Sequence, residues 1–225
     1  MLIRIADVLS EDTLGVLTDQ LKALKWEDGA RTAGSLARAV KKNEQAKLKA
    51  GVGRQLQQTL LTAIRKNAVV QAAAQPARFS DPMISRTSVG GGYGPHIDNA
   101  LMGTGAARMR SDLSYTLALN APRDYKGGAL EIESAGMVQA LHLEPGELVV
   151  YPSTSIHQIT PVSAGERIVC VGWIQSKLQD PAVREILFDL ENLRASLKAT
   201  HDPQSPELLT VTKAISNLLR RFGSP

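Results

Sequence analysis

Apolar residues in the first third of the chain recur with a helical period. Positions 14, 17, 21 and 24 share one helical face after Ser10, a residue type that commonly caps helix N-termini, so this stretch predicts an amphipathic helix. A second helical pattern covers residues 54–74 and stops before Pro76, because proline cannot continue a helix. Two helices are therefore expected before residue 77.

The pattern changes at residue 77 to short apolar runs separated by Gly, Pro, Asp and Ser, which is typical of an antiparallel β fold. Eight short strands in about a hundred residues favour a double-sheet jelly roll, whose mouth commonly holds a ligand. Helical spacing returns in residues 181–197 and 207–221. The expected strands are 77–80, 83–89, 112–119, 129–133, 137–142, 147–151, 157–162 and 167–175.

These patterns predict an α+β protein with a jelly-roll (double-stranded β-helix) core. Residues 1–76 are expected to form a mostly helical N-terminal support packed on the core, residues 77–177 the core, and residues 178–225 a C-terminal helical region. The amphipathic terminal helices could pack on the barrel or on a second subunit, so a homo-oligomer stays open.

Composition narrows the class of protein. No apolar run approaches the roughly 20 residues of a membrane-spanning helix. The N-terminal apolar stretch is too short and too charged for a secretory signal, so a cytoplasmic protein without a membrane partner is expected. Cys170 is the single cysteine, which excludes an intrachain disulfide and a cysteine-based metal cluster.

The net charge of +4 invites a test for a polyanionic partner, because basic proteins often bind nucleic acids. The densest basic cluster, residues 38–49, has Lys41, Lys42, Lys47 and Lys49 around Glu44. No aromatic platform accompanies these lysines. We interpret the cluster as a solvated helix surface, and no nucleic-acid partner is expected.

Three residues have the spacing of a metal site. His96 and Asp98 stand two apart, so in an extended segment they point to the same face, and His157 follows 59 residues after Asp98. Two histidines and one carboxylate on one side of Fe(II) leave positions open for substrate and oxygen. A zinc hydrolase with the same ligands stays open, although no obvious general-base glutamate lies near His96.

Arg167, ten residues after His157, favours iron with a dicarboxylate co-substrate, because guanidinium binds carboxylate in a bidentate manner. The segment 158–173 predicts a hairpin with a turn at 163–166. If Val162 pairs with Arg167, then His157 and Arg167 lie on the order of 16 Å apart along that hairpin. The alternative is a surface turn in which Arg167 pairs with Glu166.

Strand parity places Trp173 on the same face as Arg167, where it would pack against the site. Tyr93, three residues before the first histidine, can direct its hydroxyl towards a metal-bound ligand, or it can be a loop tyrosine packed on Pro95. His142 and His201 have no ligand-like companions and are given no role.

At these residues the chain resembles the prolyl/lysyl-hydroxylase-domain (PKHD-type) hydroxylases, a prolyl 4-hydroxylase-like branch of the Fe(II)- and 2-oxoglutarate-dependent dioxygenases. One departure is Ala129, where relatives usually carry an acid after the two glycines. The resemblance covers nearly the whole chain, and its motifs are Trp26 to Gly34, Tyr93-Gly-Pro-His96-Ile-Asp98, Tyr125-Lys-Gly127-Gly128-Ala-Leu130, the block from Gly146 to Arg167, and Trp173-Ile-Gln-Ser176.

The resemblance implies that His96, Asp98 and His157 hold Fe(2+), while Arg167 and Tyr93 bind 2-oxoglutarate. Oxygen would then convert 2-oxoglutarate to succinate and CO₂ as a C–H bond of a small-molecule or peptide substrate is hydroxylated. L-ascorbate (vitamin C), which restores over-oxidised iron, is an expected helper, and bacterial relatives are often linked to iron uptake. The alternative is a non-catalytic sensor that binds metal and 2-oxoglutarate.

Overall fold

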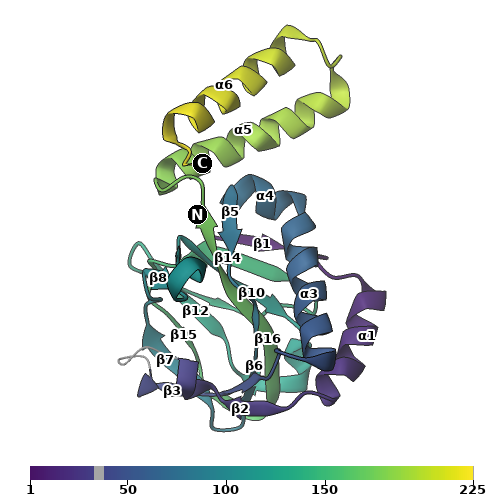
Figure 1. The fold of residues 1–225 in the computed structure, drawn as a ribbon, viewed down its shortest axis with the longest axis vertical. Coiled ribbons are helices and arrows are strands. Elements are labelled where there is room, and N and C mark those ends of the chain that lie inside the picture. Colours follow the sequence, from purple (N-terminus) through teal and green to yellow (C-terminus); the bar gives the residue numbers. More distant parts are fainter. Residues whose placement is uncertain (33–37, 225) are drawn as a thin grey trace.

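The computed structural model describes residues 1–32 and 38–224, and within them two antiparallel sheets face each other (Figure 1). Nine of the described strands form the larger sheet. Its main path runs in the order β1 (Ile3–Ile5), β14 (Leu148–Pro152), β10 (Leu113–Ala118), β16 (Val162–Ser176), β6 (Met83–Ser88), β4 (Glu44–Ala46) and β2 (Trp26–Asp28), with β5 (Pro76–Phe79) and β11 (Tyr125–Gly127) also paired to β16.

The smaller sheet covers one face of the larger one, which gives the expected jelly-roll core. Its order is β13 (Met137–Leu141), β12 (Leu130–Ser134), β15 (His157–Ile159), β7 (Gly92–His96) and β3 (Lys41–Lys42). The remaining short elements are the β8–β9 pair (Leu101–Met102, Met109–Arg110) and the 3₁₀ turns Gly29–Thr32, Gly105–Ala107 and Pro122–Asp124.

The N-terminal helices cover the outer face of the larger sheet (Figure 1). They are α1 (Glu11–Lys22), α3 (Gly51–Lys66) and α4 (Ala68–Ala74). Leu56, Leu60 and Ile64 of α3 are fully buried in one cluster with strand residues such as Leu117 and Ile174. Removal of this apolar surface from water holds the helices on the sheet.

The helical pattern of residues 54–74 forms two helices instead of one. The break lies at Asn67, whose backbone is extended and whose side-chain oxygen accepts hydrogen bonds from the amides of Val69 and Val70. Asparagine favours this capping position, because its side chain replaces the missing intrahelical acceptor.

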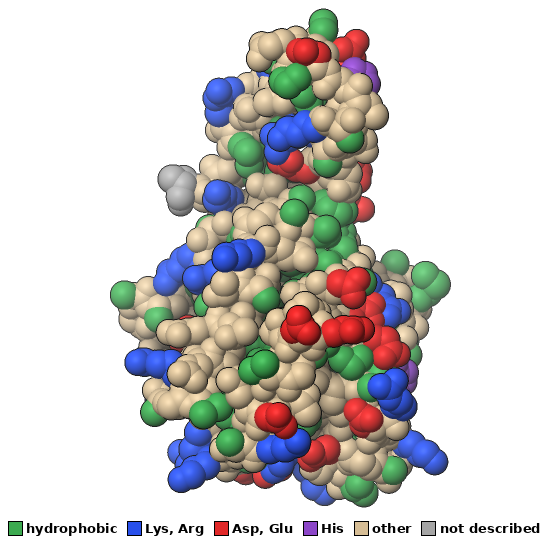
Figure 2. Space-filling view, turned by 90° about the vertical axis from the view of Figure 1, so that its right-hand side faces the viewer, with side chains coloured by type: hydrophobic (Ala, Val, Ile, Leu, Met, Phe, Trp, Pro, Cys, Tyr) green, Lys and Arg blue, Asp and Glu red, His purple; other side chains and the backbone are tan. Residues whose placement is uncertain are grey.

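The C-terminal helices α5 (Pro181–Thr200) and α6 (Pro206–Phe222) form a hairpin that stands off the sandwich (Figure 1). Leu187, Leu208 and Ile215 belong to a separate apolar cluster between the two helices, and α5 also packs against α4. Asp180 caps α5 by accepting from the amide of Ala182. In Figure 2, basic and acidic side chains share the displayed face of the molecule.

The predicted hairpin with a turn at 163–166 is wrong. β16 runs without interruption from Val162 to Ser176, and residues 162–165 pair with β11. β15 lies in the other sheet, where it pairs with β12 and β7. His157 and Arg167 therefore belong to opposite sheets rather than to one hairpin.

The basic cluster at 38–49 is not a helix surface, so that interpretation is also wrong. Lys41 and Lys42 form β3 and pair with Tyr93 and Gly92 of β7, while β4 pairs with β2 and β6. Edge strands accept charged residues because half of their side chains can stay in water. Pairing of β3 with β7 and of β4 with β6 thus outweighed the helical pattern of this segment.

Among the described residues, no helix combines the length and apolarity needed to cross a membrane.

Candidate functional site

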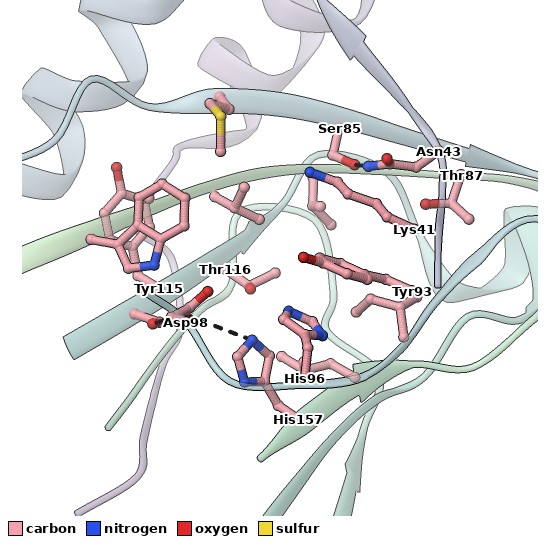
Figure 3. A pocket seen from close by; sticks show the side chains of 18 of the residues that line it. Lys41, Asn43, Ser85, Thr87, Tyr93, His96, Asp98, Tyr115, Thr116 and His157 are labelled. Atoms are coloured by element: carbon pink, nitrogen blue, oxygen red, sulfur yellow. Dashed lines mark hydrogen bonds and ion pairs between the residues drawn. The ribbon is translucent and has the colours of Figure 1, made fainter. Parts of the chain in front are cut away.

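A cavity of about 120 Å³ lies between the two sheets (Figure 3). Both sheets contribute to its walls. All six residues singled out from the sequence line it: Tyr93, His96, Asp98, His157, Arg167 and Trp173. His142 and His201, to which the sequence assigned no role, do not line it.

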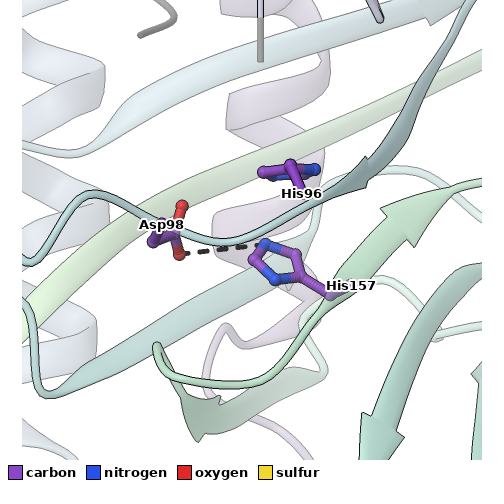
Figure 4. Close-up of side chains that lie close together, drawn as sticks. All are labelled: His96, Asp98 and His157. Atoms are coloured by element: carbon purple, nitrogen blue, oxygen red, sulfur yellow. Dashed lines mark ion pairs between the residues drawn. The ribbon is translucent and has the colours of Figure 1, made fainter. Parts of the chain in front are cut away.

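His96, Asp98 and His157 converge on one point of the cavity (Figure 4). His96 ends β7 and His157 begins β15, and the two are register partners in the smaller sheet. One potential ligand atom from each of the three side chains lies within 4.8 Å of the others, and His157 Nε2 is 3.8 Å from Asp98 Oδ2. Strand pairing therefore brings together two histidines that are 61 positions apart.

Backbone carbonyls orient both imidazoles. His96 Nδ1 lies 2.8 Å from Gly94 O, and His157 Nδ1 lies 3.0 Å from Ser155 O. A carbonyl oxygen can only accept a hydrogen bond, so each Nδ1 carries the proton and each Nε2 keeps its lone pair. Burial, followed by the neighbouring His157, lowers the pKa of His96 to about 4. A neutral imidazole of this kind is ready to coordinate a metal.

Two serines that the sequence did not reveal orient the carboxylate. Ser114 Oγ donates to Asp98 Oδ2 at 2.5 Å and lies 2.7 Å from Ser153 Oγ. Both serines are buried. They come from β10 and from the residue after β14, so no local sequence motif connects them with Asp98. Ser114 thus holds one carboxylate oxygen, Ser153 contacts Ser114 from behind, and the other carboxylate oxygen stays available for a metal.

The donor set fits a divalent cation. Two imidazole nitrogens and one carboxylate oxygen on the same side are the ligands of non-haem Fe(II) centres with open positions. Zn²⁺ accepts the same donors, so the three ligands alone do not choose between the metals.

Arg167 occupies the other end of the cavity and is 4% exposed. Its pKa is lowered by burial and raised by the neighbouring Tyr125 and Tyr151. No acid among the described residues forms an ion pair with it, and Glu166 lies instead 3.8 Å from Arg86. The alternative of a surface pair between Arg167 and Glu166 is therefore wrong. A buried guanidinium without an acidic partner is a site for an anion.

Gly128 makes room for the arginine. Its φ is +65°, and a Cβ at this position would lie 3.1 Å from Arg167 Cδ and 3.0 Å from Val162 Cγ2. Only glycine adopts this backbone conformation readily and also leaves the space free. This gives a physical reason for a glycine at the second position of the Gly127-Gly128 pair.

Tyr93 lies on β7 against the candidate metal ligand His96 rather than in a peripheral loop. Its ring stacks on His96 with 3.5 Å between centroids and 15° between planes. Its hydroxyl points into the cavity in Figure 3. Burial raises the pKa of Tyr93 to about 12, so the phenol stays neutral and can donate a hydrogen bond at neutral pH.

Trp173 lies at the metal end of the larger sheet, opposite Ser114 in the β10–β16 register. Arg167, Val169 and Val171 line the same cavity, as expected for alternate residues of a strand. Trp173 Nε1 is buried and has no hydrogen-bond partner among the described residues. A donor of this kind is available to a bound molecule.

Lys41 is the cavity residue that the sequence interpretation missed most clearly. Its Nζ lies 5.2 Å from the centroid of the Tyr93 ring, and burial lowers its pKa to about 8. The sequence signal that could have revealed it is weak, because Lys41 stands among other lysines that remain exposed.

Comparison with known proteins agrees with this geometry. Residues 82–175 match the 2OG-Fe(II) oxygenase superfamily. A PKHD-type hydroxylase of Hyphomonas neptunium is 48% identical over 222 residues, which are 99% of both chains. A PKHD-type hydroxylase of Synechococcus elongatus is 44% identical over 99% of this chain and 100% of its own.

Solved structures agree on the fold. A prolyl-4-hydroxylase of Pseudomonas putida superposes with a TM-score of 0.52 at 19% identity, covering 78% of this chain and 92% of its own. Full-length identity near one half settles the family, since the match extends beyond the metal motif to both termini. The chain belongs to the PKHD-type hydroxylases, enzymes of the 2OG-Fe(II) oxygenase superfamily.

Proposed function

We propose that this enzyme hydroxylates a substrate C–H bond and oxidises 2-oxoglutarate to succinate and CO₂. The observation that carries the proposal is the buried Arg167, which has no acidic partner among the described residues and shares a cavity with His96, Asp98 and His157. A metal held by these three residues would bind the 2-oxo acid end of 2-oxoglutarate, and the Arg167 guanidinium would bind its distal carboxylate.

In this proposal His96, Asp98 and His157 hold Fe(2+) through two Nε2 atoms and a carboxylate oxygen. Ser114 and the carbonyls of Gly94 and Ser155 keep these ligands in place. Bound iron and 2-oxoglutarate together supply the oxidant for the C–H bond. The protein contributes ligand orientation and a cavity that limits access of water.

Arg167 binds the distal carboxylate of 2-oxoglutarate with its guanidinium. Tyr125 and Tyr151 beside it keep the guanidinium in position. Tyr93 donates its hydroxyl proton as a hydrogen bond to the co-substrate, and Trp173 packs beside the metal position. These roles place one polar contact at each end of the co-substrate.

A zinc hydrolase fits the cavity less well. Such an enzyme needs a general base beside the metal-bound water. Asp98 is the single acid among the described residues that line the cavity, and it is already part of the ligand set. Arg167 would also lack an anion to bind.

The test uses the purified protein under anaerobic conditions. Fe(II) and 2-oxoglutarate should together produce a metal-to-ligand absorption band, and oxygen should then release succinate. His157→Ala should abolish both signals, because it removes one of three ligands. His142→Ala, a change at an exposed histidine outside the cavity, should retain them. Absence of the band in the unmodified protein would contradict the proposal, and a band without succinate across varied substrates would favour the sensor alternative.

Two further points of the proposal come from the family resemblance. L-ascorbate should prolong succinate release by restoring over-oxidised iron. A role in iron uptake should appear as slower growth of a deletion strain when iron is limiting.

A further inference from the structure

Asp98 is the member of the candidate ligand set that strand pairing does not hold. His96 and His157 are register partners in the smaller sheet, whereas Asp98 lies in the irregular segment after β7 (Figure 4). The two residues that follow it, Asn99 and Ala100, are exposed. Bonds from outside its own strand therefore have to fix the position of this carboxylate.

Ser111 fixes the backbone of the irregular segment. Its amide donates to Ala100 O at 3.1 Å, and its hydroxyl donates to Asn99 O at 2.5 Å. Ser111 is 6% exposed and lies just before β10, so these bonds tie the segment to the larger sheet. The Asp98 side chain can still rotate about its own bonds, and a second serine restrains that rotation.

The direction of the hydrogen bonds at the carboxylate follows from the number of protons. Ser114 Oγ lies 2.5 Å from Asp98 Oδ2, and a carboxylate oxygen can only accept. The single hydroxyl proton of Ser114 is used in that bond. Ser153 Oγ, which lies 2.7 Å from Ser114 Oγ, then has to donate the second bond. The result is a chain in which Ser153 donates to Ser114 and Ser114 donates to Asp98.

Ser153 is itself held in place. It is 3% exposed, and its amide donates to Asp112 O at 3.1 Å. The Asp112 side chain accepts from Arg110 Nε at 2.6 Å and from the amide of Ser176 at 2.8 Å. The chain of hydroxyls therefore begins at a residue whose backbone is anchored to the ends of β9 and β16.

We infer that Ser153 is a positioning residue of the metal site, which directs the single Ser114 proton onto Asp98 and thereby strengthens Fe(II) binding. Consecutive hydrogen bonds in a buried site strengthen one another, and the partners of a ligand raise metal affinity because they fix its orientation. This inference rests on the proposed function. It gives a role to a side chain that is not among the described residues lining the cavity.

The Kd of Fe(II) measures this role without turnover. Anaerobic calorimetric titration of the metal-free enzyme with Fe(II) should give a Kd about tenfold higher for Ser114→Ala and about fivefold higher for Ser153→Ala. Ser153→Thr should keep the Kd within about twofold, because the hydroxyl remains. An unchanged Kd in Ser153→Ala would overturn the inference.

A double variant separates the hydrogen-bonded chain from simple packing. In the Ser114→Ala background, Ser153→Ala should raise the Kd of Fe(II) by less than about twofold, because the acceptor of the Ser153 proton is gone. An equal loss in both backgrounds would mean that Ser153 acts through packing, and the inference would be wrong.

Ser176→Ala is the matched control. Ser176 is 1% exposed, and its hydroxyl bonds to Gln75 O and to the amide of Leu178, away from the cavity. This variant should lower the melting temperature and leave the Kd of Fe(II) unchanged. A fivefold rise in Ser176→Ala as well would assign the effect of Ser153→Ala to lost stability and contradict the inference. Failure of the unmodified enzyme to bind Fe(II) would instead defeat the proposed function, and the inference with it.

Discussion

The two cations of the cavity, Arg167 and Lys41, have very different surroundings. Arg167 is 4% exposed, lies beside Tyr125 and Tyr151, and has its space set by a glycine at position 128. Lys41 is only partly buried, lies over one aromatic ring and belongs to a two-residue edge strand.

This difference indicates that the protein holds the two cations with different rigidity. A deeply buried cation in rigid surroundings suits a ligand that is the same in every turnover, since the arrangement needs no adjustment. A lysine at an edge strand has a flexible stem and three rotatable donors, so its ammonium group can change position more easily. If the two cations act separately, a change at Arg167 should alter 2-oxoglutarate binding and a change at Lys41 should not.

Loss of the buried cation should have the largest effect. Arg167→Met is expected to raise the Kd of 2-oxoglutarate about a hundredfold, because the distal carboxylate would lie buried without a partner. Titration of the anaerobic Fe(II) enzyme by its absorption band measures this Kd. Arg184→Met is the matched control, since Arg184 is also 4% exposed but donates to Leu178 O near the helical hairpin. Arg184→Met should lower the melting temperature and leave the Kd of 2-oxoglutarate unchanged. Equal Kd values for the two variants would mean that Arg167 has no special role in binding 2-oxoglutarate.

Crowding the arginine should have a moderate effect. Gly128→Ala places a methyl group 3.1 Å from Arg167 Cδ at φ +65°, so we expect about 1–2 kcal/mol of destabilisation and about a fivefold weaker 2-oxoglutarate complex. Denaturant unfolding and the absorption titration measure the two quantities.

Gly136→Ala separates backbone strain from crowding. Gly136 has φ +77°, and a Cβ there would meet nothing within 4 Å. This variant should lose similar stability and keep its 2-oxoglutarate affinity. Weaker 2-oxoglutarate binding in Gly136→Ala would mean that global stability, not space around Arg167, sets the affinity.

A rise in pH should have the smallest effect and should act on one end only. Lys41 is protonated below its pKa of about 8, so its charge should be about half lost at pH 8 and largely absent above it. Arg167 stays charged there, and 2-oxoglutarate affinity should stay level. Lys41 faces Tyr93, His96, Asp28 and Asp98.

Two neighbouring groups titrate far from pH 8, since the pKa of Tyr93 is about 12 and that of His96 is about 4. Lys41→Arg, which stays charged above pH 8, should therefore have the same 2-oxoglutarate affinity as the unmodified enzyme there. A fall in 2-oxoglutarate affinity above pH 8 that is absent in Lys41→Arg would show that Lys41 binds the co-substrate and that the two cations do not act separately.

The candidate metal ligands could be predicted from the sequence because their geometry is partly local. His96 and Asp98 are two residues apart in an extended segment, and Arg167 and Trp173 share strand parity in β16. The eight strands expected between residues 77 and 175 are all present, with ends shifted by a few residues. Strand alternation and turn residues act over a few positions, so their consequences can be predicted without the fold.

Other parts depended on pairing between distant strands. The segment 158–173 satisfies hairpin rules, yet β15 pairs with β7 and β12 while β16 joins the opposite sheet. Lys41 belongs to a run of lysines that resembles a solvated surface, and only its pairing with Tyr93 turns it inward. Ser114 reaches Asp98, and Ser153 reaches Ser114, through the same kind of long-range packing.

By itself, the sequence determined the class of fold, the three metal ligands to be expected and the residue type for an acidic co-substrate, because local periodicity and donor chemistry carry that information. Tertiary structure alone decided which strands face each other, that Arg167 has no acidic partner in the described residues, and that Lys41 enters the same cavity. The physical reason is that burial and charge pairing arise from contacts between residues far apart in the chain, and such contacts exist only once both sheets have closed around the cavity.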